Sequence, residues 1–198
     1  MLAQSALDFL RDLAENNDRE WFHAQKSRYE QALKKPFEAF VGALIEQVQA
    51  VDPSVLITPR QAVFRIYRDT RFSADKAPYK THASAIISPF GTRSKEYPGF
   101  YVHLEAEKLM LGGGAYFLEK ESLKKVREAI AEDAESFMEL VESPSFVKHY
   151  GKVLGEQNKR LPAEFQEMAR AVPLIANKQF YYMAELPAGD ARGAQAIS

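Results

Sequence analysis

Residues 60–117 alternate between apolar and polar side chains in short runs, and helical patterns lie on both sides of this region. The alternation is clear over residues 63–68 and 100–105, and residues 81–88 and 108–111 also favour strands. Closely spaced strands flanked by helical blocks indicate an α+β fold with an antiparallel sheet rather than a doubly wound sheet.

The helical blocks occupy the N-terminal part of the chain and much of the sequence after residue 118. Leu7, Leu10 and Leu13 recur at helical spacing. Residues from about 19 to 50 form either two helices or one kinked helix, with Pro36 at the interruption. We therefore predict a sheet of about four or five strands from the middle of the chain, packed against N- and C-terminal helices.

The overall composition is that of a globular protein and excludes several functional classes. Hydrophobic residues make up 46% and charged residues 27% of the 198 residues, and there is no cysteine. These values predict a single domain, with a loosely ordered tail from about residue 187. The lack of cysteine excludes disulfides, thiol catalysis and cysteine-based metal sites. With neither a signal peptide nor a membrane-spanning run apparent, we expect a soluble, cytoplasmic protein.

One stretch of the chain is strongly basic although the whole chain is not. From Arg60 to Lys80 there are six basic and two acidic residues, an excess of plus four in a chain whose formal net charge is minus one. We call residues 65–80 the basic loop. Such a local excess indicates either a bound anion or acidic partners within the fold.

The basic side chains of this loop are the main candidates for ligand binding. Guanidinium and ammonium groups suit phosphate or carboxylate, which accept several charge-assisted hydrogen bonds. The candidates are Arg65, Arg68, Arg71, Lys76 and Lys80. The alternative is that these residues pair with acids such as Asp69 and Asp75 and brace the loop internally. Both interpretations can hold for different members.

Two further features carry candidate chemistry. Gly112, Gly113 and Gly114 form a run that permits a phosphate-binding nest of backbone N–H groups, or a bulge or close backbone approach within a sheet. His103 shares one side of its predicted strand with Tyr101 and is a candidate acid–base residue. The alternative is a hydrogen-bonded structural histidine. The other histidines lack metal-ligand spacing, so no metal site is predicted.

The segment before the first aromatic cluster is open to two interpretations as well. Residues 16–22 read Asn-Asn-Asp-Arg-Glu-Trp-Phe, which is typical of a capped helix N-terminus followed by core residues. Arg19 and Trp21 are also placed to line a cleft. The structural role is favoured.

These stretches together resemble a known family. The blocks are Asn16-Asn-x-Arg-Glu-Trp-Phe22, Phe64-Arg-Ile-x-Arg-Asp-x-Arg-Phe72, Asp75-Lys-x-Pro-Tyr-Lys-Thr81 and Gly112-Gly-Gly114, with later blocks at Lys159-Arg-Leu-Pro162 and Lys178-Gln-Phe180. They closely resemble the domain-of-unknown-function 2461 family, uncharacterised proteins of similar length from bacteria and fungi. The resemblance covers nearly the whole chain and implies a shared fold, but it names no activity.

Two classes of function follow from these observations. In the first, a binding module or enzyme takes a phosphorylated or other anionic small molecule, with the basic loop holding the anion, Tyr79 and Tyr101 shaping the pocket and His103 as the acid–base group. In the second, a noncatalytic interaction module presents its basic loop to an acidic protein or a nucleic-acid backbone. A pI near 6.5 makes nucleic acid the less favoured partner. The sequence defines neither a cofactor nor an oligomeric state.

Overall fold

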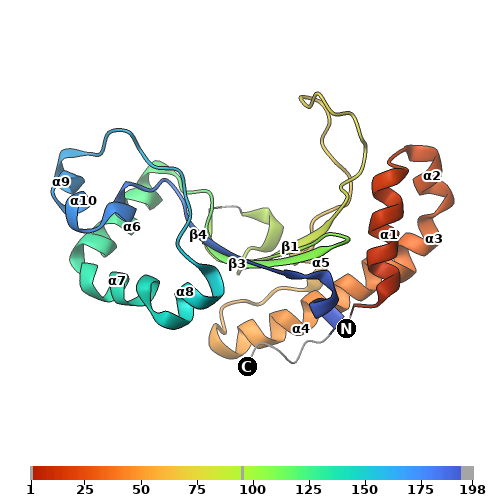
Figure 1. Cartoon of the computed structure of the whole chain (residues 1–198), viewed down its shortest axis with the longest axis horizontal. Coiled ribbons are helices and arrows are strands. Elements are labelled where there is room, and N and C mark those ends of the chain that lie inside the picture. Colours follow the sequence, from red (N-terminus) through yellow and green to blue (C-terminus); the bar gives the residue numbers. More distant parts are fainter. Residues whose placement is uncertain (1, 95, 193–198) are drawn as a thin grey trace. The chain divides into compact units, whose positions relative to one another are not determined.

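The structure is a computed structural model that describes residues 2–94 and 96–192 (Figure 1). Its described residues fall into two compact units. Unit 1 lies within Met1–Arg93, Phe100–Leu111 and Glu185–Ser198, and unit 2 lies within Ser94–Gly99 and Gly112–Ala184. The prediction of a single domain stays a prediction. Among the described residues, no helix combines the length and apolar character needed to cross a membrane.

A four-stranded antiparallel sheet confirms the predicted α+β class. Its strands follow the order β1-β2-β3-β4 and comprise Ala83–Ile87 (β1), Gly99–Leu104 (β2), Lys108–Ala115 (β3) and Phe180–Pro187 (β4). β1 and β2 pair with Ser84 opposite His103 and Ala85 opposite Val102. This register places Ala85, Val102 and Leu104 in the core and puts His103 on the opposite face.

The sheet differs from the prediction at two places. Residues 63–68 form no strand and make only isolated bridges, from Val63 to Ala85 and from Tyr67 to Tyr79, because the chain turns away into the basic loop after one contact with β1. The fourth strand is β4, from the C-terminal part of the chain. Most of its side chains are half-buried, and its sequence lacks the apolar–polar alternation that identified the other strands.

The helices of unit 1 precede the sheet in the sequence. They are α1 (Gln4–Glu15), α2 (Arg19–Ala24), α3 (Lys26–Arg28), a π-helical segment η1 (Tyr29–Lys34), α4 (Lys35–Val51), α5 (Pro59–Ala62) and the short 3-10 helix η2 (Gly91–Arg93). The predicted helical region of residues 19–50 is divided at Gln25, and the chain is then helical from residue 26 to residue 51, so the division does not fall at Pro36. Pro36 lacks an N–H donor, and the widened π turn directly before it accommodates the missing hydrogen bond.

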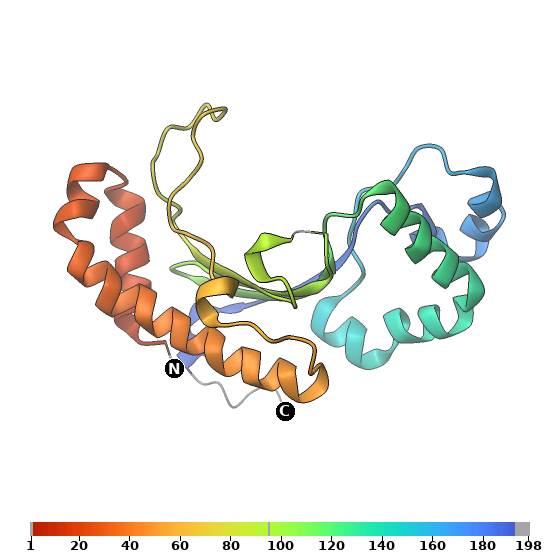
Figure 2. The same ribbon diagram turned by 180° about the vertical axis from the view of Figure 1, so that it is seen from behind.

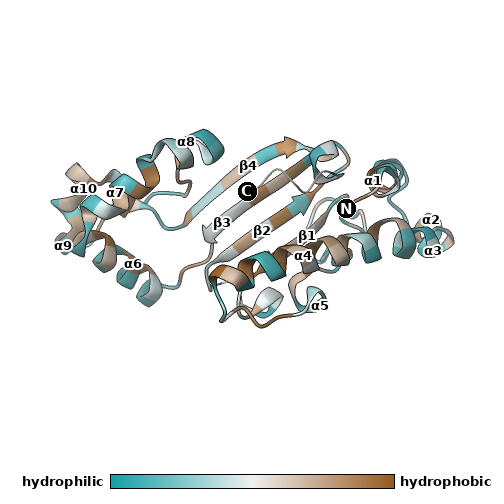
Figure 3. Cartoon of the chain, turned by 90° about the horizontal axis from the view of Figure 1, so that it is seen from below, coloured by the Kyte–Doolittle hydropathy of each residue, from teal (hydrophilic) through white to brown (hydrophobic). Residues whose placement is uncertain are grey.

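One face of the sheet and the long helices enclose the core of unit 1. Leu10 and Leu13 of α1 and Phe37 and Val41 of α4 are buried in the same cluster as Leu104. Figure 2 shows α4, in orange, along this face, and Figure 3 shows the same helix beside β1 from below. Ser84 and His103, on the opposite face of β1 and β2, are buried as well.

Unit 2 has its own set of helices and a smaller core. The helices are α6 (Lys120–Glu132), α7 (Ala134–Glu142), α8 (Pro144–Tyr150), α9 (Ala163–Gln166), α10 (Met168–Ala171) and η3 (Pro173–Ala176). Ile130, Phe165 and Ile175 lie at the centre of this core. The buried guanidinium of Arg127 donates hydrogen bonds to the carbonyls of Ile175 (2.9 Å) and Asn177 (3.1 Å), which gives these buried donors and acceptors hydrogen-bond partners.

The C-terminal residues are only partly described. After Pro187, residues Ala188–Arg192 form a 3-10 helix, η4. Ala188 is buried, and its N–H donates to the carbonyl of Glu107. The remainder of the tail predicted to be loosely ordered, residues 193–198, lies outside the described residues.

Candidate functional site: a basic pocket beside helix α2

The basic loop rises from the fold as a ribbon whose two arms are hydrogen-bonded at its base (Figure 1). The N–H of Arg68 donates to the carbonyl of Pro78 at 2.9 Å, and the N–H of Lys80 donates to the carbonyl of Ile66 at 2.8 Å. Between these two hydrogen bonds, Tyr67 and Tyr79 form an antiparallel β-bridge. The base of the loop is therefore fixed by backbone pairing, like the end of a β-hairpin.

The turn between α1 and α2 holds the returning arm of the loop through one amide side chain. Nδ2 of Asn17 donates to the carbonyl of Tyr79 at 3.0 Å, and the N–H of Tyr79 donates to Oδ1 of Asn17 at 3.1 Å. The next residue, Asp18, caps α2 by accepting hydrogen bonds from the N–H groups of Glu20 and Trp21. The Asn-Asp pair thus fixes both the loop and the start of α2.

A cavity of about 340 Å³ lies between α2 and the base of the basic loop. From the helical side it is lined by Arg19, His23 and Lys26, and from the loop by Tyr67 and Arg68, with other residues of both segments. Arg19 and His23 lie four residues apart in α2, which places them on one face of that helix, and Lys26 begins α3 after the break at Gln25. We call this cavity the α2 pocket.

Aromatic rings form the floor of the α2 pocket. Phe22 stacks on Tyr79 with ring centroids 3.9 Å apart and an angle of 18° between the rings, and both residues are buried. Tyr67 lies 5.4 Å from Tyr79 and is 48% exposed. Burial raises the pKa of Tyr79 above its ordinary value. Tyr67 is therefore the ring whose surface is most open to a ligand.

The walls of the α2 pocket carry basic side chains that lack an ion-pair partner in the described part of the chain. Among the described residues, the side chains of Arg19, His23 and Lys26 form no ion pair. Arg68 is paired with Asp75, whose own side chain is 64% exposed. Concentrated cationic groups beside a cavity raise the local concentration of anions.

The other predicted donors of the basic loop are mostly engaged within it. Arg71 donates to both carboxylate oxygens of Asp69, at 3.0 and 2.7 Å, and these hydrogen bonds lower the pKa of Asp69 to about 2. Lys76 donates to the carbonyl of Thr70 at 2.9 Å. Arg65 is exposed. Arg71 and Lys76 thus make the bracing contacts within the loop, and anion binding stays a prediction for the other basic residues.

His103 and Tyr101 belong to a second cluster, on the face of β1 and β2 opposite the core of unit 1. The hydroxyl of Tyr101 lies 3.0 Å from Nδ1 of His103, and Nε2 of His103 lies 2.9 Å from Oε1 of Glu105. Burial raises the pKa of Tyr101, although a hydrogen bond with Ser84 opposes this shift. Both nitrogens of His103 are engaged, and its side chain is 10% exposed. These contacts match the structural role more closely than the acid–base role, which stays a prediction.

His82 covers the ring of His103 and was not among the candidates from the sequence. The two rings stack with centroids 4.1 Å apart. Burial of His82, with the nearby His103 and the charge of Lys80, lowers the pKa of His82 to about 4. Across residues 2–94 and 96–192, no group of three or more histidine and acidic residues is placed to hold a metal ion.

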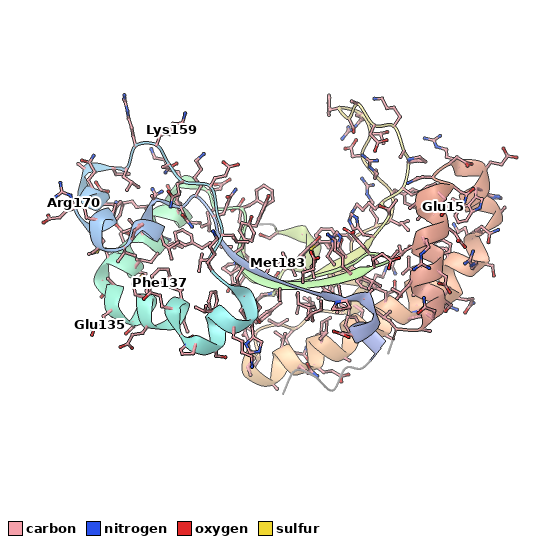
Figure 4. The ribbon with its side chains drawn as sticks, in the orientation of Figure 1. Glu15, Glu135, Phe137, Lys159, Arg170 and Met183 are labelled. Carbon is pink, nitrogen blue, oxygen red and sulfur yellow. The ribbon has the colours of Figure 1, made fainter. Side chains whose placement is uncertain are left out.

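The three glycines lie in the part of β3 that belongs to unit 2. A Cβ atom at Gly112 would lie 2.3 Å from the carbonyl oxygen of Tyr182 and 2.8 Å from the sulfur of Met183, which is labelled in Figure 4. At Gly114 it would lie 2.1 Å from the carbonyl oxygen of Phe180, and the phenol of Tyr182 covers Gly113. The close backbone approach of β4 accounts for the glycine run, and the phosphate nest stays a prediction.

The sequence indicated some lining residues of the α2 pocket and missed others. Arg68, Tyr79 and Arg19 were candidates, whereas His23, Lys26 and Tyr67 were not. The only signal in the sequence was the close spacing of the basic residues 19, 23 and 26. This spacing predicts a pocket only if another segment is known to pack beside these residues. Trp21, the other cleft candidate, packs against Phe9, with the centres of the two rings 5.9 Å apart.

The fold and this site define an α+β protein with a four-stranded antiparallel sheet and a basic–aromatic pocket between an N-terminal helix and a hydrogen-bonded loop. The chain belongs to the family described as conserved hypothetical protein, domain of unknown function 2461 (DUF2461), whose family model matches residues 5–197. Comparison with curated proteins gave no match, and comparison with solved structures gave none either.

Proposed function

We propose that this protein binds a small anionic molecule, and most favourably a phosphorylated one, in the α2 pocket. The observation that carries the proposal is the convergence of Arg19, His23 and Lys26, which lack ion-pair partners among the described residues, on a cavity of about 340 Å³. Holding the charges of Arg19 and Lys26 together is unfavourable without a counter-charge, and a phosphate or carboxylate supplies that counter-charge with several charge-assisted hydrogen bonds.

The aromatic floor narrows the class of ligand. The exposed surface of Tyr67 offers a planar contact beside the cationic wall. The cavity has the size of a small metabolite site. The favoured ligand therefore combines an anionic group, which contacts Arg19 and Lys26, with a flat or apolar part that packs on Tyr67. Binding is the whole of the proposal, and no reaction is assigned.

A thermal-shift screen against phosphorylated metabolites and nucleotides tests the proposal. A ligand present at about a hundred times its Kd adds about 2.7 kcal/mol to the free energy of unfolding, which raises the Tm of a chain of this size by roughly 5–10 °C. Lys26→Gln should reduce this shift. Lys35→Gln is the matched control, because it removes the same charge from an exposed residue of unit 1 that does not line the pocket. Equal shifts in the two variants would refute the α2 pocket as the site.

A second candidate function is a noncatalytic interaction module, and one observation favours it. Phe72 at the tip of the basic loop is 95% exposed, and the guanidinium of Arg71 lies 5.8 Å from the centre of its ring. An exposed ring with basic neighbours can stack on an unpaired base while the cations contact the backbone. Fluorescence anisotropy with a single-stranded oligonucleotide separates the candidates: Phe72→Ala should weaken that binding only if the loop tip is the interface.

A cytoplasmic location is part of the proposal. It is supported by the absence of cysteine from the sequence, which fits a reducing compartment, and by the abundance of phosphorylated metabolites there. Fractionation of cells that express a tagged full-length chain tests this location directly.

A further inference from the structure

A second cavity lies in unit 2, at the segment that leads into α9. Its volume is about 380 Å³, and it is lined by Asn158, Lys159, Arg160, Leu161 and Gln166. The first four residues are consecutive, and Gln166 comes from α9. We call this cavity the unit 2 pocket. Three of its residues belong to one of the sequence blocks that resemble the family, and binding in the α2 pocket gives that block no role.

Hydrogen bonds hold the lining segment at both ends. At its start, the N–H of Asn158 donates to the carbonyl of Ala176 at 2.8 Å. At its end, Nε2 of Gln166 donates to the carbonyl of Leu161 at 3.1 Å. The backbone of the segment is therefore fixed before any ligand binds, which lowers the entropic cost of binding.

The chain to which the lining segment is bonded is itself anchored in the core of unit 2. The buried guanidinium of Arg127 donates to the carbonyls of Ile175 and Asn177, the two residues that flank Ala176. Gln157 and Asn177 form an antiparallel β-bridge. The unit 2 pocket thus lies at the end of a paired ribbon that the core supports.

The unit 2 pocket carries two basic side chains that the described part of the chain leaves without an ion-pair partner, those of Lys159 and Arg160. Consecutive side chains of a straight strand point to opposite faces, but the backbone bends at these two residues, and both line the same cavity. Lys178 on the paired ribbon, by contrast, is matched by Glu156. Two adjacent cations at a cavity attract an anion, and a phosphate accepts hydrogen bonds from both.

The amide side chains of the unit 2 pocket indicate what else the ligand carries. The side chain of Asn158 forms no hydrogen bond with the described residues, and Gln166 uses its Nε2 for Leu161 and keeps its carbonyl oxygen as an acceptor. Such amides can donate to and accept from hydroxyl groups. None of the described lining residues is aromatic, so this pocket offers no stacking surface of the kind that Tyr67 gives the α2 pocket.

We propose that the unit 2 pocket binds a phosphorylated polyhydroxyl compound, with Lys159 and Arg160 on the phosphate and the amides of Asn158 and Gln166 on hydroxyl groups. The site is separate from the α2 pocket, because its described lining residues all belong to unit 2 and those of the α2 pocket all belong to unit 1. The two pockets also select differently, since a planar ligand suits only the α2 pocket. The proposal is one of binding and includes no reaction.

Amide NMR spectra of the full chain locate the binding of a probe, for which we choose glucose 6-phosphate. The amides of residues 158–161 should shift and saturate as this probe is added. Glucose lacks the anion and should bind at least about tenfold more weakly, whereas inorganic phosphate lacks the hydroxyl contacts and should bind at least about threefold more weakly.

Arg160→Gln tests the cationic wall and should raise the Kd of glucose 6-phosphate about tenfold, and Lys159→Gln should raise it about threefold or more. Arg170→Gln is the matched control, because it removes the same charge from an exposed residue of α10 that does not line the pocket. Figure 4 shows Arg170 apart from Lys159. The control should change the Kd by less than about twofold, and the amide spectrum of each variant shows whether it is folded.

The spectra also distinguish the two pockets. Shifts confined to residues 19–26 and 67–79 would overturn this inference and support the α2 pocket. Saturable shifts at residues 158–161 support the inference whether or not the α2 pocket responds, and the Lys26→Gln comparison then decides on the α2 pocket alone. An equal rise in Kd for Arg160→Gln and Arg170→Gln would show that only the net charge of unit 2 matters, and it would overturn the site.

Discussion

At the scale of single residues, His82 links the stability of the protein to pH. Its pKa is about 4 in the folded chain against an ordinary value of 6.5, so the unfolded chain binds the proton more tightly. The stabilisation is complete above about pH 6.5 and is lost as the pH falls to about 4, because the unfolded chain alone takes up the proton in that window.

We therefore expect His82→Gln to flatten the dependence of stability on pH. After allowance for solvent screening of a half-buried ring, the unmodified protein should lose about 1–2 kcal/mol more than the variant between pH 6.5 and pH 4. Urea unfolding at a series of pH values measures this difference. Parallel curves for the two proteins would show that His82 titrates alike in the folded and unfolded chains.

Asn17 is the second residue whose contacts make a sharp prediction. Asn17→Ala removes both hydrogen bonds to the backbone of Tyr79 and should lower the free energy of unfolding by about 1–3 kcal/mol. It should also weaken anion binding, because the loop wall of the α2 pocket loses its attachment. Asn16→Ala is the neighbouring control, since the side chain of Asn16 donates only to the carbonyl of Asp12 within α1. Chemical denaturation and ligand titration of both variants provide the comparison.

At the scale of elements, the approach of β3 to β4 depends on the absence of side chains at the glycine run. Gly114 has a φ of +113°, and a Cβ atom there would meet the carbonyl oxygen of Phe180 at 2.1 Å. Gly114→Ala should therefore destabilise the protein by about 3 kcal/mol or more, from backbone strain and steric overlap together.

The matched control for this prediction lies at the end of α8. Gly151 has a φ of +73° but has no atom within 4 Å of an added Cβ. Gly151→Ala should cost only about 1 kcal/mol, the conformational term alone. Thermal unfolding of both variants separates the cost of backbone strain from the cost of steric overlap with β4. Equal losses of stability in the two variants would mean that the approach of β4 is not what requires glycine in β3.

At the scale of the whole molecule, the charge of the basic loop contrasts with a net charge of minus one. Binding of an anion to this loop should therefore depend strongly on salt although the protein as a whole is nearly neutral. We expect the Kd of a phosphorylated ligand to rise roughly threefold to tenfold between about 0.05 and about 0.5 M NaCl. Calorimetric titration measures this trend. An affinity that does not change with salt would indicate that apolar packing on Tyr67 dominates instead.

The sequence predicted the class of fold correctly, but it did not predict which segments form all four strands of the sheet. Strands with alternating side chains were found, because one face of each packs on the core of unit 1. β4 was missed because its half-buried residues do not alternate, and residues 63–68 alternate without forming a strand because their neighbour in the ribbon is the returning loop rather than a long partner strand.

The candidate site was predictable only as far as local sequence reaches. The charge of the basic loop was visible along the chain, and so was the pairing of Arg71 with Asp69, two residues away. His23 and Lys26 line the pocket because the Asn17 side chain holds the backbone of Tyr79, 62 positions later in the chain, beside α2. The stack of His82 on His103 depends on the register of β1 and β2. Contacts of this kind are set by tertiary structure.

The hydrogen-bonded base of the basic loop has a consequence for how such a protein can diverge. Because Arg68 is already bonded to Pro78 and Lys80 to Ile66, the segment between them can change in length or composition without disturbing the pairing below it. Insertions at the tip would alter what the loop contacts, while the core beneath Tyr79 stays the same. The tip of the loop can therefore change its ligand while the paired base keeps its structure, as in other folds that carry variable loops on a rigid frame.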